Sequence, residues 1–402
     1  KKIISNYRVS LAKPMIICCI VAVSLSIASM VLGLGLIKGF QDTLIHKFRN
    51  FSGDYIIKPY QVDNAETLTN GTTLILSDSL INSLNEIKPR INYYPFLEIP
   101  VLLQSRNEFK NVLAMGITVP FLQQIKNNLV SGISDTTLKL NEIIISKKIA
   151  DQLNISNQKS LKLILFENQQ GQPKIFYLKI KSIYETYIEE IDKNTVFLNL
   201  HFLQHIVGFT HDKKMSGIKV FFQESKNANK EANLQALTES MPLEFEIIPW
   251  QQQFQQLLDW LEVQNLNKKV LLIILFIVAF INVITCIFVL ITDRLKMIGI
   301  LTYMGIKSSQ MLKIFSMQSF FIWFIGSLGG VIISFILAYI QNNYHILALD
   351  PNVYYIKYPV IIIEKSILLY IIIGMLAICF LASILPVWFV TKTKPVELLR
   401  RT

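Results

Sequence analysis

Apolar residues gather in four long runs, one near the beginning of the chain and three in its last third. The runs cover residues 15–37, 270–292, 314–340 and 367–391, and none of them contains Asp, Glu, Lys, Arg or His. A helix of about 20 apolar residues is long enough to cross the hydrocarbon core of a bilayer. The pattern therefore predicts four transmembrane helices, with a large water-compatible segment, 38–269, between the first and the second.

Basic residues are concentrated in three short segments that flank the apolar runs, 1–14, 293–313 and 392–402. Together these segments carry twelve Lys or Arg residues and only two acidic ones, Asp293 and Glu397, a net of +10 out of a formal +11 for the whole chain. The positive-inside rule assigns such segments to the cytoplasm. We therefore expect both termini and the loop between the second and third spans to be cytoplasmic.

The remaining polar segments are close to neutral. Segment 38–269 holds 25 basic and 24 acidic residues, and loop 341–366 holds two of each. We expect both to lie on the outer, periplasmic side. A nucleic-acid partner is not predicted, because it would need basic residues clustered on one exposed face. The first apolar run is too long for a typical signal peptide and lacks a small-residue cleavage site, so we expect it to be retained as a span.

The four cysteines are Cys18, Cys19, Cys286 and Cys379, and each lies inside an apolar run. Segment 38–269 contains none. Neither a disulfide framework nor a thiolate metal site is therefore expected there, and a buried cysteine in a helix usually acts as a small apolar residue.

Two amphipathic stretches lie at the ends of segment 38–269 and continue the neighbouring spans. Their apolar residues recur at helical spacing. They are Phe40, Leu44, Ile45, Phe48 and Phe51 after the first run, and Trp250, Phe254, Leu257, Leu258 and Leu261 before the second. We interpret them as two stalk helices that pack against each other. The alternative is a pair of helices lying on the membrane surface.

Between the stalks, short runs rich in Ile, Val, Phe and Tyr alternate with helical patterns. The predicted strands are 55–58, 98–104, 111–116, 161–166, 175–183, 195–199, 218–222 and 245–248. The predicted helices are 79–88, 119–129, 146–153, 200–207 and 227–241. The fold class is therefore a membrane protein with four transmembrane α-helices and a large α+β periplasmic domain, which we expect to form two lobes.

We find no catalytic residue in this sequence. His201 and His205 have the i, i+4 spacing of a metal site, but no third ligand lies nearby, so we predict no metal. The acidic residues Glu189, Glu190 and Asp192 are expected to form a solvated turn. There is no Gly-x-x-x-x-Gly-Lys phosphate loop, so we expect the chain not to be an enzyme and not to bind ATP in that way.

The apolar runs contain no ionisable residue, which argues against an ion or proton pathway. Asn282 is the most polar side chain of the second run and is expected to hydrogen-bond to a neighbouring helix. The third run carries small residues at Gly326, Gly329, Gly330 and Ser334. This face favours close helix packing, and it is compatible with a dimer.

The segment 293–313 is too long for a tight turn, and Ile298, Leu301, Met304 and Met311 lie among its basic residues. This composition predicts a short helix at the inner membrane surface with an apolar face. The segment from Arg294 to Phe315 resembles the coupling segment of MacB-like, FtsX-type ABC permeases. The resemblance extends to Gly39-Phe40, Met115-Gly116-Ile117 with Pro120, the segment 143–153, Ile183-Tyr184-Glu185-Thr186, Ala382-Ser383 with Pro386, and 394–400.

Within that superfamily the chain is most similar to the lipoprotein-releasing, Lol-type permease subunits. This resemblance implies an inner-membrane protein that binds a cytoplasmic ABC ATPase dimer, with ATP and Mg in that partner and no cofactor in this chain. It also implies a second permease subunit, either a copy or a paralogue, a lipoprotein cargo, membrane lipid, and a periplasmic lipoprotein carrier. The alternatives are MacB-like export of a peptide or drug, and FtsX-like signalling to a periplasmic cell-wall enzyme.

The same resemblance assigns residues to three roles. Contact with the ATPase is expected at Arg294, Met297, Ile298, Gly299, Ile300, Leu301, Met304, Gly305 and Ile306. Contact with acyl chains is expected at Val31, Leu34, Phe280 and Ile284, and carrier binding in the loop with Glu167, Gln172, Pro173 and Lys174. Two positions depart from the family pattern, because Met297 stands where an acidic residue is usual and Ile306 where Ala is common.

Overall fold

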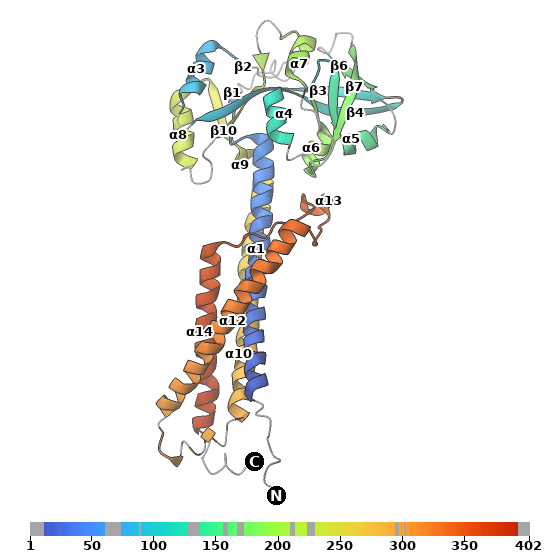
Figure 1. Cartoon of the computed structure of the whole chain (residues 1–402). Helices are drawn as coiled ribbons and strands as arrows, with labels where there is room; N and C mark the ends of the chain where they lie inside the picture. The colour runs from blue at the N-terminus through green and yellow to red at the C-terminus, as the bar shows by residue number, and fades with distance from the viewer. Residues whose placement is uncertain are drawn as a thin grey trace. The chain divides into compact units, whose positions relative to one another are not determined.

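A computed structural model of the chain describes residues 12–60, 74–87, 90–126, 137–155, 160–166, 173–209, 214–222, 230–293, 297–298, 300, 303–306 and 308–392 (Figure 1). The chain divides into two compact units. The helical unit contains 1–43, 259–349 and 358–402, and the α+β unit contains 44–258 and 350–357.

The helical unit is built on α1 (Ala12–Ser52), α10 (Gln255–Asp293), α12 (Ser308–Tyr344) and α14 (Lys365–Lys392). Each is long and apolar enough to cross a membrane, which confirms the prediction of four apolar helices. They are longer than the apolar runs because the helices continue into polar flanks. In α1 this flank is the first amphipathic stretch, so the first predicted stalk is continuous with its span. The second predicted stalk is divided, because a short helix, Trp250–Gln253, ends before Phe254 and α10 begins at Gln255.

The small-residue face of α12 packs against α1 of the same chain. Ser24 Oγ on α1 donates a hydrogen bond to the carbonyl of Gly326 at 2.9 Å. A Cβ added at Gly326 would lie 2.7 Å from Val23, and one added at Gly330 would lie 2.7 Å from the carbonyl of Ser24. Glycine is therefore needed for this close approach, and the face is covered within the chain.

Buried apolar residues of all four helices form one core. They include Val23, Ile27, Met30 and Leu34 of α1, Ala279, Val283 and Ile287 of α10, Phe315 and Ile322 of α12, and Ile371, Met375 and Ala382 of α14. Trp323 of α12 also donates its indole N–H to the carbonyl of Ile372 of α14 at 3.1 Å. The remaining faces of these helices carry many exposed large apolar residues, as expected for helices surrounded by lipid.

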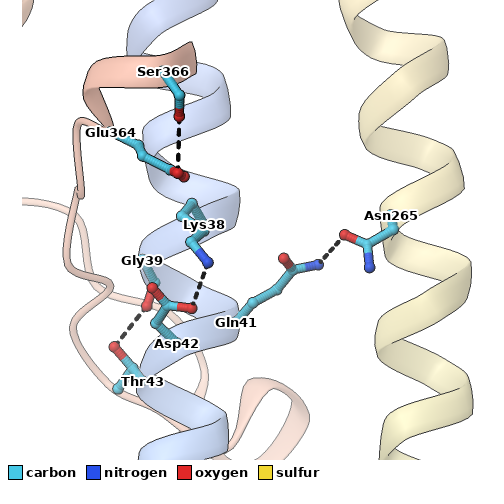
Figure 2. A network of polar contacts seen from close by, with 8 residues as sticks. All are labelled: Lys38, Gly39, Gln41, Asp42, Thr43, Asn265, Glu364 and Ser366. Carbon is cyan, nitrogen blue, oxygen red and sulfur yellow. Dashed lines mark hydrogen bonds and ion pairs between the residues drawn. The ribbon is translucent and has the colours of Figure 1, made fainter. Parts of the chain in front are cut away.

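The two stalk stripes contact each other, as the first interpretation predicted. In the helical unit the rings of Phe40 and Trp260 lie 5.9 Å apart, and Gln41 donates to Asn265 at 3.1 Å. In the α+β unit the rings of Phe48 and Phe254 lie 4.8 Å apart. Figure 2 shows the polar contact between α1 and α10 beside the Lys38–Asp42 ion pair of α1.

An extended segment before α14 lies against a glycine notch in α1. The amide of Ile362 donates to the carbonyl of Gly35 at 3.1 Å. The backbone of Ile361 is held by Asn342, whose side chain accepts from its N–H at 2.8 Å and donates to its carbonyl at 3.0 Å. A Cβ placed on Gly39 would lie only 1.8 Å from the carbonyl oxygen of Val360. The notch therefore requires glycine.

The α+β unit contains a nine-stranded sheet in the order β11-β1-β10-β3-β4-β8-β5-β7-β6. Its strands are β1 (Tyr55–Pro59), β3 (Ile91–Ser105), β4 (Glu108–Ile117), β5 (Glu142–Ser146), β6 (Ser160–Leu165), β7 (Lys174–Tyr184), β8 (Thr195–Asn199), β10 (Gly217–Phe222) and β11 (Phe245–Pro249). The short strands β2 (Leu74–Ile75) and β9 (Lys214–Met215) pair separately.

The long strand β3 joins two lobes. Its first residues pair with β10 and its later ones with β4 and β6. Because β6 also pairs with β3, strands β3, β4, β8, β5, β7 and β6 close into a ring around one apolar core. A second core lies between β1, β10, β3 and the helices α3 (Asp78–Glu86) and α8 (Lys230–Ser240).

The other helices of this unit are α4 (Val119–Lys126), α5 (Lys147–Gln152), α6 (Glu189–Asn194), α7 (Leu200–Val207), α9 (Trp250–Gln253) and α13 (Pro351–Tyr354). The mixed α+β class and its two lobes were predicted. Strands β2, β5 and β9 and helices α6 and α13 were not predicted, whereas α9 lies within the second predicted stalk.

We expect Gly39→Ala to lower the melting temperature of the full chain in detergent, because the new methyl group would displace the backbone at Val360. Overpacking of this kind costs about 1–3 kcal/mol, which exceeds the gain of about 1 kcal/mol in helix propensity. The matched control is Gly33→Ala in the same helix, where the Cβ would lie an ordinary 3.7 Å from Leu271. Equal melting temperatures for the two variants would contradict the notch.

Candidate functional site

Among the described residues of the predicted coupling segment, Ile298 is buried in the helical core, whereas Met297, Ile300 and Met304 are exposed. Ile298 is only 2% exposed and belongs to the same buried cluster as Met311 of α12. Met297, Ile300 and Met304 are exposed to 41%, 55% and 73%. An exposed apolar surface next to a buried anchor is typical of a protein interface.

A short helical turn shapes this segment. The amide of Met304 donates to the carbonyl of Ile300 at 3.0 Å, and Gly305 follows with a φ of +89°, a left-handed conformation that favours glycine. Ile306 is half-buried. The other predicted contact residues, Arg294, Gly299 and Leu301, lie outside the described residues.

Two of the residues expected to contact acyl chains are instead buried inside the helical core. Val31 and Leu34 are 3% and 1% exposed, whereas Phe280 and Ile284 are partly buried at its edge. The assignment of Val31 and Leu34 must therefore be corrected. Close packing turns one face of α1 inward, and composition alone could not distinguish that face from one turned to lipid.

The expected carrier loop follows β6. Glu167 and Gln172 lie outside the described residues, and Pro173 and Lys174 are exposed at the start of β7. Phe166, Ile175 and Tyr177 beside the loop are exposed to 63%, 50% and 69%. These large apolar side chains were missed as site candidates because each also fits a strand pattern.

A dense joint forms where α1 ends in the α+β unit. Gly53 has a φ of +89° and its amide donates to the carbonyl of Arg49 at 2.7 Å. Lys219 of β10 donates from Nζ to the carbonyl of Phe51 at 2.7 Å. The last carbonyls of a helix lack partners within it and carry partial negative charge, so a lysine here stabilises the helix end.

Lys219 is itself enclosed by the protein. It is 5% exposed, its Nζ lies 5.1 Å and 4.9 Å from the ring centroids of Phe96 and Phe121, and the sulfur of Met115 lies at 3.7 Å. Burial lowers the pKa of Lys219 from 10.5 to about 8, against the opposing attraction of the Glu98 carboxylate. The ammonium thus depends on the helix carbonyl and the aromatic faces that replace water.

Asp54 ties the end of α1 to two further elements. Its carboxylate pairs with Arg49 and accepts the amide of Phe222 at 2.8 Å. Its amide donates to Val220 at 2.7 Å, and its carbonyl accepts the amide of Trp250 at 3.2 Å. Helix α1, strand β10 and the start of α9 are therefore held at one residue.

A cavity of about 400 Å³ lies beside this joint. Its lining comes from the end of α1, from α9 and from strands of both lobes, and includes Phe51, Ile56, Met115, Phe197, Lys219 and Phe254. Lys219 therefore forms part of the wall of this cavity while it holds the helix end. Because its Nζ already has a carbonyl, a sulfur and two aromatic faces as neighbours, we assign it to the joint.

The structure contradicts the prediction that Asp192 lies in a solvated turn. Asp192 lies in α6 and is 1% exposed. Its carboxylate accepts from the amide and hydroxyl of Thr186, at 3.0 Å and 2.7 Å, and from the amide of Tyr187 at 2.9 Å. Burial nevertheless raises the pKa of Asp192. Glu189 and Glu190 are exposed as predicted, and the acidic run alone gives no signal that one member turns inward.

The two histidines of α7 have no third metal ligand beside them among the described residues. His201 and His205 are both exposed. Among the residues that the structure describes, no group of three His, Cys, Asp or Glu side chains could hold a metal ion.

The buried Lys219 predicts a pH dependence of stability. Between about pH 8 and pH 10.5 the folded chain has lost this proton while the unfolded chain keeps it, so the free energy of unfolding rises with pH. The gain is at most roughly 3 kcal/mol for a shift of this size. Relative to Lys219→Met, the melting temperature of the wild type should therefore rise from pH 7 to pH 10.

Lys179→Met, at an exposed position of β7, is the control and should follow the wild type. Burial also raises the pKa of Tyr184 above 10, which lowers stability at the top of this range in every variant, so the comparison uses differences between variants. A difference between wild type and Lys219→Met that stays constant with pH would contradict the burial of a charged lysine.

Comparison with known proteins gives three findings. Residues 269–395 match the family model described as FtsX-like permease C-terminal. The chain is 24% identical over 323 residues to the lipoprotein-releasing system transmembrane protein LolC of Xylella fastidiosa strain Temecula1. This alignment covers 76% of each of the two chains. The chain is 22% identical over 408 aligned positions to LolC of Buchnera aphidicola subsp. Schizaphis graminum, covering 98% of this chain and 95% of the relative.

The third finding concerns solved structures. The periplasmic region of MacB from Actinobacillus actinomycetemcomitans is 10% identical, with a TM-score of 0.35, and covers 52% of this chain and 94% of that one. The extracellular domain of the ABC-type transporter YknZ from Gram-positive bacteria is 14% identical, with a TM-score of 0.32, and covers 48% and 99%.

Proposed function

We propose that this chain, which is similar to FtsX-like permeases and to the LolC proteins, is the permease subunit of a lipoprotein-releasing ABC transporter. A separate cytoplasmic ATPase dimer hydrolyses ATP and binds the coupling segment. The resulting movement of the helices reaches the α+β unit and releases acylated proteins from the inner membrane. The observation that carries the proposal is the coupling segment with its buried anchor and exposed apolar face.

The proposed orientation follows from charge. Segments 1–14, 293–313 and 392–402 face the cytoplasm, where the ATPase is, because they carry the basic excess. Segments 38–269 and 341–366 face the periplasm. A second permease subunit, a copy or a paralogue, completes the transporter, because four spans are few for a path that handles an acylated protein.

Movement of the ATPase would act on Ile298 and α12 first. Ile298 belongs to the same buried cluster as Met311 and Phe315 of α12, so a displaced coupling segment pushes on packed side chains. Closely packed interiors transmit such displacements because they have few voids to absorb them. At the other end of α1, the joint of Lys219 and Asp54 supports transfer of that movement to the sheet.

The exposed side chains of Phe166, Ile175 and Tyr177 support a docking role for the loop between β6 and β7. We propose that a periplasmic lipoprotein carrier binds there and takes up the released cargo. Phe280 and Ile284, at the edge of the helical core, remain our candidates for contact with acyl chains in the membrane.

Met304→Asp should reduce binding of the ATPase by more than about tenfold, because a charge would be desolvated in an apolar interface. Ser309→Asp is the matched control. It adds the same charge at an exposed position in the first turn of α12, where an acidic residue is favourable. The measurement is the amount of ATPase that co-purifies with each variant from membranes. Recovery of the ATPase with Met304→Asp at the wild-type level would refute the proposed contact surface.

The cargo is tested with the purified complex in proteoliposomes. A fluorescent lipoprotein with its acyl chains should stimulate ATP hydrolysis and leave the vesicles when ATP and a soluble carrier are supplied. The same protein without acyl chains should do neither. Stimulation by a peptide or drug alone would instead support an exporter, and ATP-dependent activation of a cell-wall hydrolase without release would support signalling.

A further inference from the structure

A short segment between α12 and α14, Asp350–Lys357, packs within the α+β unit, although the residues before and after it belong to the helical unit. We call it the α13 segment, because it contains α13. The amides of Val353 and Tyr354 donate to the carbonyl of Asp350 at 3.2 Å and 3.0 Å. Ile356 is 5% exposed. The segment is therefore a folded turn with its own buried residue.

Lys47 of α1 holds this segment. Its Nζ donates to the carbonyl of Tyr355 at 2.6 Å, and the neighbouring ring of Phe48 lies 6.0 Å from the ring of Tyr355. Lys47 also lies over the ring of Tyr187, at 5.2 Å from its centroid. Lys47 is only 9% exposed, so these contacts replace most of its hydration. A lysine is rarely buried to this extent without a partner.

The two tyrosines that Lys47 contacts share an unusual backbone. Tyr187 has a φ of +59° and Tyr355 a φ of +61°. A bulky residue adopts this left-handed region only where its surroundings hold it. For Tyr187 the support is Asp192, which accepts its amide at 2.9 Å, and the charge of this carboxylate also attracts Lys47. Tyr355 is held at its carbonyl by Lys47 and at its amide by the carbonyl of Pro351, at 2.9 Å.

A stalk helix does not need a buried lysine for stability or solubility. Lys38, nine residues earlier on the same helix, pairs with Asp42 at 3.0 Å and keeps a third of its side chain exposed. Lys47 differs because its ammonium is directed at a main-chain carbonyl of a segment far away in the sequence. That difference indicates a dedicated contact.

We propose that Lys47 is a positioning residue that clamps the α13 segment to α1 and so gives α12 and α14 their own connection to the α+β unit. Helices α1 and α10 enter the α+β unit directly along the chain, but α12 and α14 have only the loop that contains this segment. The role that we assign to this clamp depends on the proposed function. The clamp keeps the movement of α12 and α14 coupled to the release of cargo.

The clamp is tested first by hydrogen exchange of the full chain in lipid nanodiscs. Lys47→Met keeps the length and helix propensity of the side chain but removes its donor. The amides of Val353, Tyr354 and Tyr355 should then exchange at least tenfold faster. Lys47→Arg should restore most of the protection, and Lys38→Met should leave it unchanged. Unaltered exchange of 350–357 in Lys47→Met would overturn the clamp.

Coupling is measured in the proteoliposome assay as lipoprotein released per ATP hydrolysed. Lys47→Met should lower this ratio several-fold while basal ATP hydrolysis stays at the wild-type level, and Lys47→Arg should recover it. A ratio equal to that of Lys38→Met would overturn the role in coupling. If Lys47→Met does not accumulate in the membrane, Lys47→Gln replaces it in both experiments. The glutamine side chain is too short to reach the carbonyl of Tyr355, so the expected results are the same.

The two proposals fail separately. If the wild-type complex releases no lipoprotein, the proposed function fails, and the exchange experiment still decides whether Lys47 holds the α13 segment. If the wild type releases lipoprotein but Lys47→Met does so with an unchanged ratio, only the role of the clamp in coupling is lost.

Discussion

The α+β unit depends on how the end of α1 is held. Lys219 places a buried ammonium against the carbonyl of Phe51, and Asp54 bonds to β10 and to the start of α9. These contacts satisfy the polar groups that every helix end leaves open. They also fix the direction in which α1 meets the sheet, because a helix bonded at its last carbonyls cannot pivot without breaking several bonds at once.

In the helical unit, close packing adds to the hydrogen bonds between helices, such as that from Trp323 to Ile372. Glycines on α12 allow α1 to approach closely, and Gly39 accommodates the extended segment before α14. The coupling segment joins the same core through Ile298 and leaves apolar side chains such as Met304 exposed. Van der Waals packing drives association of helices in lipid, and these close contacts are of that kind.

The sequence predicted the elements better than the directions of their side chains. Hydropathy identified the four apolar helices, and β8 (Thr195–Asn199) and α7 (Leu200–Val207) have the predicted bounds. Strand β5 was missed because a short, fully buried run shows no alternation. The inward turn of Asp192 and the burial of Val31 arise from contacts between distant parts of the chain, which no local pattern records. Lys47 and Lys219 were missed for the same reason.

The central claim is that the end of α1 and the sheet of the α+β unit move as one body. The direct test is the distance between spin labels at exposed positions His46 of α1 and Glu239 of α8, with the four native cysteines replaced by serine. The complex is measured without nucleotide and after vanadate trapping. We predict the same mean distance in both states. A distance that changes on trapping would place a hinge at Gly53 and contradict a rigid joint.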